Sequence, residues 1–318
     1  MTESQQQQDL RHDEVQAGTT TGLASPSVDV TSDRQNSLWS DAWGQLKRNV
    51  LFWIGAVLCV LFLAMALFPS VFARGADPRA CDLANSNETP SADHWLGYDL
   101  QGCDYLANVV YGARNSLLIG VLAVLGVLVL GVVVGAIAGF YGRFTDSLLS
   151  RLTDIFYALP TVLGALVLLR TGVLGDRGPR AVAIALALFS WMTAMRLVRS
   201  QVIAVKSSDY VAAARAMGAS DVRILVRHIL PNAVAPVLVF ATITIGVLIA
   251  AEATLTYLGV GLQAPAISWG LQIAQGQALL RTAPHLVLFP SIILTLTVMA
   301  FILMGDALRD ALDPRQRS

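Results

Sequence analysis

Charged residues, and lysines above all, are scarce in this chain. Asp, Glu, Lys and Arg make up 14% of its 318 residues, and the only lysines are Lys47 and Lys206. Neither lysine follows a glycine-rich phosphate-binding loop, so the chain lacks the motif with which P-loop proteins hold ATP. The H-E-x-x-H pattern of zinc proteases and the G-x-S-x-G pattern of serine hydrolases are also missing. We therefore expect no catalytic residue in this chain and no ATP hydrolysis by it.

Cysteine and histidine are also rare. The chain has three cysteines and four histidines, and they form no cluster with the spacing of a metal site. We therefore assign no metal ligand. The formal net charge of zero gives no sign of a nucleic-acid partner, and none is expected.

Apolar residues dominate what remains. They make up 55% of the chain, and the mean hydropathy is +0.59, so too few charges are left to cover a soluble protein of this length. Several apolar runs reach the roughly 20 residues that a helix needs to cross a bilayer. The sequence predicts an all-α polytopic membrane protein with six transmembrane helices. We place them at about residues 50–68, 116–140, 147–169, 181–198, 234–257 and 285–304.

The polar segments indicate how the chain is divided and oriented. Residues 1–45 carry too few apolar groups to fold, so we expect a disordered cytoplasmic tail, followed by a transmembrane domain at residues 46–318. With the N-terminus inside, the inner flanks carry thirteen Lys and Arg residues and the outer segments seven. The positive-inside rule then places both termini in the cytoplasm and the acidic loop 70–105 outside.

The three cysteines follow from this topology. Cys59 lies within the first span, where we expect a small packing residue. Cys81 and Cys103 share the outer loop, in an oxidising compartment. We predict a disulfide between them that closes a loop of roughly 20 residues and contributes about 3 kcal/mol.

Two spans carry features of helix packing. Gly131, Gly135 and Gly139 recur every four residues, and we expect this stripe to let another helix of the same chain approach closely. Pro160 is expected to kink the third span, with its freed carbonyl satisfied by neighbours. Arg151 and Asp154 lie three apart and are expected to form a structural ion pair.

One polar stretch, the loop at residues 200–232, interrupts the apolar runs. Its main part, DYVAAARAMGASDVRILVRHILPN at residues 209–232, predicts two short helices. Ser208 and Ser220 are expected to cap them, Gly218 to end the first and Pro231 to end the second.

The second of these helices has two kinds of surface. An apolar face follows from helical spacing, while Arg223 and Arg227 lie four apart on another face. A basic helical hairpin on the cytoplasmic side is suited to contact a protein outside the bilayer; the alternative is contact with lipid headgroups alone. The apolar face consists of Val222, Leu225, Val226 and Ile229.

This hairpin resembles the EAA loop of ABC importer permeases, where Glu-Ala-Ala is followed by Gly and a terminal Leu-Pro. Ala212 stands where the glutamate is usual. Other stretches, including SLLIGVLAV, RLTDIFYALP, SWG and GDALRDALDPR, resemble the C-type permease of oligopeptide and dipeptide importers over about residues 45–314. One departure is Cys103, where the family usually has arginine. The hairpin residues that match the family are Ala213, Ala214, Gly218, Leu230 and Pro231.

The resemblance implies the type I ABC importer permease fold, with cytoplasmic coupling helices, in a bacterial plasma membrane. It implies as partners a second homologous permease, ABC ATPase subunits, an extracytoplasmic substrate-binding protein and membrane lipid. ATP and Mg²⁺ would bind to the ATPase subunits, and no cofactor to this chain. The residues that would couple to the ATPase are Ala212, Ala213, Ala214, Arg215 and Gly218.

Peptide import is the function that the resemblance implies, with two alternatives. Nickel and glutathione importers share the same template, although His12 in the tail and His228 in the hairpin leave few histidines for a metal pathway. The alternative from another class is an ATP-independent carrier or a membrane enzyme.

Near the outer end of the fifth span, Glu252 is an ionisable residue at membrane depth, which makes it a candidate for the substrate pathway. The other interpretation is that it reaches the headgroups or bonds a neighbouring helix. The loop that follows contains Trp269, Leu271, Leu279 and Leu280, which we expect to lie along the membrane interface as a short helix.

Overall fold

The computed structural model of this chain describes residues 43–175 and 177–312, and all its named elements are helices. Four helical runs are each long and apolar enough to cross a membrane, and two bent pairs bring the number to six when each pair counts as one span. This agrees with the predicted six-span fold. The expected tail at residues 1–45 falls almost entirely outside the described residues. The four runs are α3 (Val50–Leu67), α5 (Tyr105–Tyr141), the run Asp221–Tyr257, which includes α12 (Val234–Tyr257), and α14 (His285–Leu312).

Helices α3 and α5 each begin at a side-chain cap. Oδ1 of Asn49 accepts from the N–H of Leu51 at 2.9 Å, and Oδ1 of Asp104 accepts from the N–H of Ala107 at 2.9 Å. The 37 residues of α5 span about 55 Å at about 1.5 Å each, against a hydrocarbon core of about 30 Å. The helix therefore continues past the membrane, and it begins at Tyr105 rather than near Ser116.

The third and fourth spans are each broken into two helices. α6 (Arg143–Tyr157) and α7 (Thr161–Arg170) meet at 80°, and α8 (Pro179–Leu188) and α9 (Trp191–Lys206) meet at 50°. The kink predicted at Pro160 is confirmed, and it is a full break. The two breaks support each other, because the Thr161 hydroxyl donates to the Phe189 carbonyl at 2.9 Å. A neighbouring side chain thus satisfies a carbonyl at a helix end.

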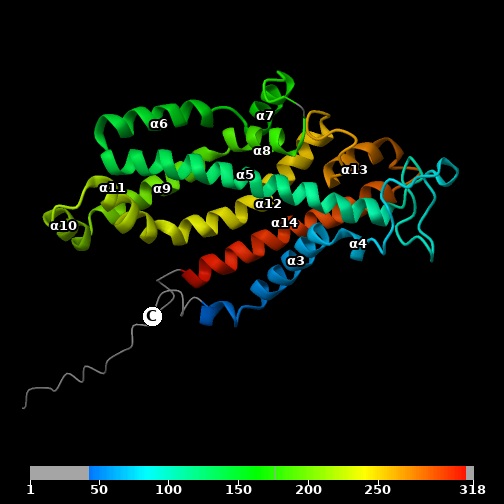
Figure 1. Cartoon of the computed structure of the whole chain (residues 1–318), viewed down its shortest axis with the longest axis horizontal. Helices are drawn as coiled ribbons and strands as arrows, with labels where there is room; N and C mark the ends of the chain where they lie inside the picture. Colours follow the sequence, from blue (N-terminus) through cyan, green and yellow to red (C-terminus); the bar gives the residue numbers. More distant parts are fainter. Residues whose placement is uncertain (1–42, 176, 313–318) are drawn as a thin grey trace, which may run out of the picture. The chain divides into compact units, whose positions relative to one another are not determined.

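Helix α5 lies at the centre and packs along α9, with α3, α8 and α12 also against it (Figure 1). The predicted role of the glycine stripe is confirmed. A Cβ added at Gly135 would lie 2.5 Å from the carbonyl oxygen of Met195, and one at Gly139 would lie 2.8 Å from that of Arg199. Only glycine lets the backbones of α5 and α9 approach this closely.

The ion pair predicted between Arg151 and Asp154 is wrong. Asp154 instead pairs with Arg196 of α9 at 2.8 Å. About one turn further along α9, Nε of Arg199 donates to Oδ1 of Asp146 at 2.5 Å and Nη2 donates to Oδ2 at 2.7 Å. Both pairs tie α6 to α9, a tertiary contact that local spacing did not indicate.

Short elements complete the chain. The hairpin at residues 209–232 contains α10 (Asp209–Ala216), α11 (Asp221–Ile224), the π-helix η2 (Leu225–Ile229) and most of the 3-10 helix η3 (Leu230–Ala233). At the opposite end, which is the predicted outer side, are α4 (Pro69–Phe72), η1 (Leu83–Asn85), α13 (Trp269–Gly276) and η4 (Gln277–Leu279).

Candidate functional site

The first half of the hairpin forms largely as predicted. Gly218 has a φ of +80°, which is the left-handed conformation that ends a helix, and the N–H of Ala219 donates back to the carbonyl of Ala214 at 3.1 Å. The predicted side-chain cap at Ser208 is wrong. Its hydroxyl makes no capping bond, and its backbone carbonyl instead accepts from the N–H groups of Val211 and Ala212.

The second half differs from the prediction. Ser220 makes no side-chain cap, and Pro231 does not end the helix, because the chain runs through η2 and η3 directly into α12. Proline lacks an N–H and disturbs the helical ladder around it. The wider π-turn absorbs this disturbance, and Nδ2 of Asn232 donates to the carbonyl of His228 at 2.6 Å.

The predicted apolar face of the second helix is only partly buried. Ile229 is buried, but Val222 and Val226 are 66% and 57% exposed. The reason is that the buried cluster uses Ile224 in place of these valines. In this cluster Ile224, Ile229 and Val211 of the hairpin pack with Ala136 and Phe140 of α5 and with Val198 and Val202 of α9.

The residues predicted to couple to an ATPase fall into two groups. Ala212, Ala213, Arg215 and Gly218 are exposed, whereas Ala214 is buried. Arg223 and Arg227 are exposed too. Together with Met217, which is 82% exposed, and the two valines, they form a surface of apolar and cationic side chains. We call the residues Met217, Val222, Arg223, Val226 and Arg227 the hairpin surface.

Glu252 of α12 is fully buried in the single chain. Its Oε1 accepts from the hydroxyl of Thr256 at 2.9 Å and from that of Ser268 at 3.3 Å. Each hydroxyl in turn accepts from a backbone N–H, that of Leu262 for Thr256 and that of Leu271 for Ser268. Oε2 has no hydrogen-bond partner within the described residues. The carboxyl therefore fixes the turn after α12 and the start of α13.

Trp269, the first residue of α13, does not lie along an interface as predicted. Its side chain is fully buried, its Nε1 donates to the Val109 carbonyl at 2.9 Å, and its ring meets that of Phe62 edge-on at 6.2 Å. Its own N–H donates to the Ser116 hydroxyl at 3.2 Å. Buried indole N–H groups need such partners, so Trp269 anchors α13 to α5.

A disulfide and a hydrogen-bonded cluster of side chains hold the outer loop. Cys81 and Cys103 form a disulfide across a sequence separation of 22 residues. Beyond it, Nδ1 of His94 lies 2.8 Å from Asp104 and Nε2 lies 2.7 Å from the Tyr98 hydroxyl. Burial, then Glu88 and the other nearby carboxylates, raises the pKa of Tyr98, so this hydroxyl keeps its proton beside His94. Sequence reasoning missed this cluster, whose acidic member, Asp104, also caps α5.

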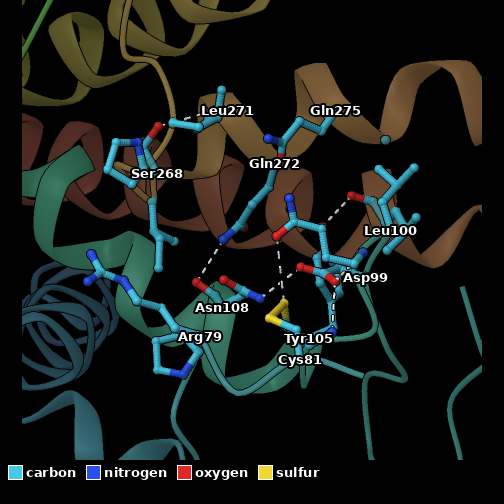
Figure 2. Close-up of a pocket in the computed structure, with 18 of the residues that line it drawn as sticks. Arg79, Cys81, Asp99, Leu100, Tyr105, Asn108, Ser268, Leu271, Gln272 and Gln275 are labelled. Carbon is cyan, nitrogen blue, oxygen red and sulfur yellow. Dashed lines mark hydrogen bonds between the residues drawn. A yellow bond between two sulfur atoms is a disulfide. The ribbon is translucent and has the colours of Figure 1, made fainter. Parts of the chain in front are cut away.

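A cavity of about 390 Å³ opens between this loop and α13, and Figure 2 shows the residues that line it. Its walls are cross-linked by hydrogen bonds. Nε2 of Gln272 donates to the Asn108 carbonyl at 2.7 Å, and Nδ2 of Asn108 donates to Asp99 at 3.0 Å. Oε1 of Gln272 is buried without a partner in the described part of the chain. We call this cavity the outer pocket.

Residues 131–318 match the family described as the inner membrane component of binding-protein-dependent transport systems, and residues 37–90 match the N-terminal transmembrane domain of oligopeptide transport permease C. The chain is 40% identical over 282 residues to a dipeptide transport system permease of Alkalihalophilus pseudofirmus, covering 89% of this chain and 91% of the relative.

Two further relatives are similar along most of their length. An oligopeptide transport system permease of Bacillus subtilis is 38% identical over 286 residues, which cover 90% of this chain and 92% of the relative. A glutathione transport system permease of Escherichia coli is 38% identical over 286 residues, which cover 90% of this chain and 93% of the relative.

Proposed function

This chain belongs to the family of inner membrane components of binding-protein-dependent transport systems, and from this membership we propose that it is the permease subunit of an ATP-driven peptide importer. The peptide class is supported by relatives whose names specify dipeptides, oligopeptides and glutathione. The pathway would run between this chain and a second homologous permease. A substrate-binding protein would deliver the peptide from outside.

The hairpin surface is the observation that carries this proposal. It leaves two valines and a methionine exposed beside two arginines at the expected cytoplasmic end, where an apolar patch marks a site of protein contact. The ATPase subunits, with ATP and Mg²⁺ bound, would dock there. Of the coupling residues, Ala212, Ala213, Arg215 and Gly218 have the exposure that contact needs, while Ala214 would shape the hairpin from inside.

The packing behind the hairpin explains how a push would reach the membrane. Ile224 and Ile229 are fully buried against α5 and α9, and η3 continues into α12 without a loop. A displacement of the hairpin therefore moves three spans through close-packed side chains, which resist compression. ATP-driven closure of the ATPase subunits would use this connection to open the pathway outward, and hydrolysis would reset it.

For Glu252 we propose the second of its two interpretations, in which it holds α13 to α12 at the outer end. Its full burial and its two bonds from hydroxyl groups support this role. The substrate pathway would then lie beside this junction.

Copurification tests the docking. Val222→Asp places a charge on the hairpin surface without disturbing the core, and we expect it to reduce the ATPase recovered with the tagged chain at least about tenfold, a loss of roughly 1.4 kcal/mol. Deletion of residues 211–217 should abolish recovery. The matched control is Val173→Asp, because Val173 is 77% exposed but lies on the predicted outer side. Equal recovery with Val222→Asp and the wild type would refute the docking surface.

Two more measurements test orientation and substrate. A cysteine at the exposed Ser220 should react with a membrane-impermeant reagent only after cells are opened. Labelling of that cysteine in intact cells would place the hairpin outside and refute the importer. Uptake of labelled dipeptide, glutathione and nickel by the reconstituted complex distinguishes the solutes, and we expect uptake of the peptides alone.

A further inference from the structure

The outer pocket carries one free charge. Among the described residues that line it, Arg79 is the one cation and Asp99 the one acid. The Asp99 carboxylate is already occupied, because it accepts from the N–H groups of Gln101 and Cys103 and from Asn108. Within residues 43–175 and 177–312 the guanidinium of Arg79 has no ion pair and is exposed. Asp99 keeps its negative charge, but its acceptor positions are filled by these neutral donors, so Arg79 is the charged side chain of the described lining that stays available to a ligand.

The rest of the lining is suited to peptide groups. Gln101 and Gln275 are exposed side-chain amides, and each offers both donors and an acceptor. Leu100, Leu271 and Pro265 supply apolar wall between them. An amide donates and accepts as a peptide unit does, and apolar wall accommodates side chains without selecting one strongly.

The pocket is formed before any ligand arrives. Its loop wall is held by the disulfide and by Asp99, and its α13 wall is held by the bond between Gln272 and Asn108. Its volume of about 390 Å³ lies near the lower end of the range for small-molecule sites, about 300–1,000 Å³. A preformed site of this size suits a ligand of a few residues, because little ordering is needed on binding.

We propose that the outer pocket binds the carboxyl-terminal end of a short peptide. Arg79 pairs with the terminal carboxylate, Gln101 and Gln275 bind the last peptide unit, and the apolar wall receives a side chain. The inference rests on the proposed function, and it places a peptide contact on this chain outside the pathway between the two permeases.

The test uses the assembled transporter in lipid nanodiscs, without the substrate-binding protein. Binding of the peptide Ala-Ala-Ala and of its carboxyl-terminal amide is titrated by saturation-transfer NMR. We expect the free acid to bind about tenfold more tightly than the amide, as a hydrogen-bonded charge requires. Arg79→Gln should remove this difference, and Arg79→Lys should restore part of it.

A matched control lies in the same loop. Arg74 stacks on the Trp95 ring at 4.9 Å and does not line the pocket, so Arg74→Gln should bind both peptides like the wild type. A second variant, Gln275→Glu, adds a carboxylate to the pocket and should weaken the free acid while sparing the amide. Gln275→Glu therefore tests the pocket even if the Arg79→Gln variant does not fold.

Three results would overturn the proposal. The first is equal affinity of the wild type for the peptide acid and its amide. The second is an Arg79→Gln variant that still prefers the acid. The third is an Arg79→Gln variant that binds free peptide like the wild type but no longer docks the substrate-binding protein. The two proposals can fail separately. If the complex takes up no peptide but binds the peptide acid more tightly than the amide, and this preference needs Arg79, the importer function is refuted and the pocket is supported.

Discussion

The Thr256 hydroxyl donates a hydrogen bond of 2.9 Å to Oε1 of Glu252, one helical turn away on α12. Because the Thr256 hydroxyl donates its hydrogen in this bond, its oxygen is left to accept from the N–H of Leu262. Ser268 is oriented in the same way and caps α13. The buried carboxyl of Glu252 thus positions two hydroxyl groups, one that holds the turn after α12 and one that caps α13.

Replacing Glu252 separates its two interpretations. Glu252→Ala removes the acceptor of two buried hydroxyls, and we expect it to lower the free energy of unfolding by about 3 kcal/mol. Glu252→Gln keeps an acceptor oxygen and should cost about 1 kcal/mol. Thermal unfolding in detergent measures both. The control is Thr254→Val, because Thr254 is exposed and bonds only its own helix.

A pathway residue would behave differently. If Glu252 faced the substrate, Glu252→Gln would change the KM for peptide while leaving the unfolding temperature of the complex unaltered. That outcome would contradict the holding role.

The contact of Trp269 with α5 predicts a second stability effect. Trp269→Phe keeps the apolar bulk but leaves the buried Val109 carbonyl without a donor, so we expect a loss of about 1–3 kcal/mol. Trp95→Phe is the matched change, because Trp95 is exposed and makes no such bond. Equal unfolding temperatures for the two variants would show that the indole bond contributes nothing.

The sequence predicted those parts of the fold that depend on local pattern. The bounds of α3 and α12 agree closely with the predicted spans, since an apolar run of fixed length is a local signal. The break at Pro160 and the left-handed Gly218 follow from the backbone chemistry of single residues. The close contact at Gly135 likewise followed from a spacing of four.

What the sequence did not predict depends on partners far away in the chain. Trp269 bonds Val109 across 160 positions, and a tryptophan in a polar loop is typical of a membrane interface. Asp154 had a near neighbour in Arg151 but pairs with Arg196, 42 positions on. The burial of Ile224 together with Ile229 was not predicted, because a π-turn shifts the helical phase that periodicity assumes.

The outer pocket left no local signal of its own. Its walls come from the disulfide loop, the start of α5, the segment at residues 264–268, α13 and the start of α14, and its polar residues are spread from Arg79 to Gln275. For the hairpin surface the sequence did predict a cationic face at Arg223 and Arg227, because the two residues lie four apart on one short helix.

The contact between α5 and α9 predicts a strong effect of a single methyl group. Gly135→Ala would place Cβ 2.5 Å from a backbone oxygen, so the two helices must separate. We expect a loss of about 1–3 kcal/mol, as for overpacking in a core. Gly44→Ala is the control, since a Cβ there meets nothing within 4 Å. If thermal unfolding showed Gly135→Ala to be as stable as this control, the close approach would not exist in the protein.

The disulfide offers the last prediction. Changing both Cys81 and Cys103 to Ser releases a loop closed over a separation of 22 residues, and we expect a loss of about 3 kcal/mol in the outer loop. The loop wall of the outer pocket should loosen, so hydrogen exchange at the amides of residues 81–103 should accelerate. Cys59→Ser, the matched loss of a free cysteine, should leave that exchange unchanged because Cys59 lies in α3. Non-reducing digestion and mass spectrometry should find Cys81 linked to Cys103, whereas free thiols at both positions would remove the basis of the prediction.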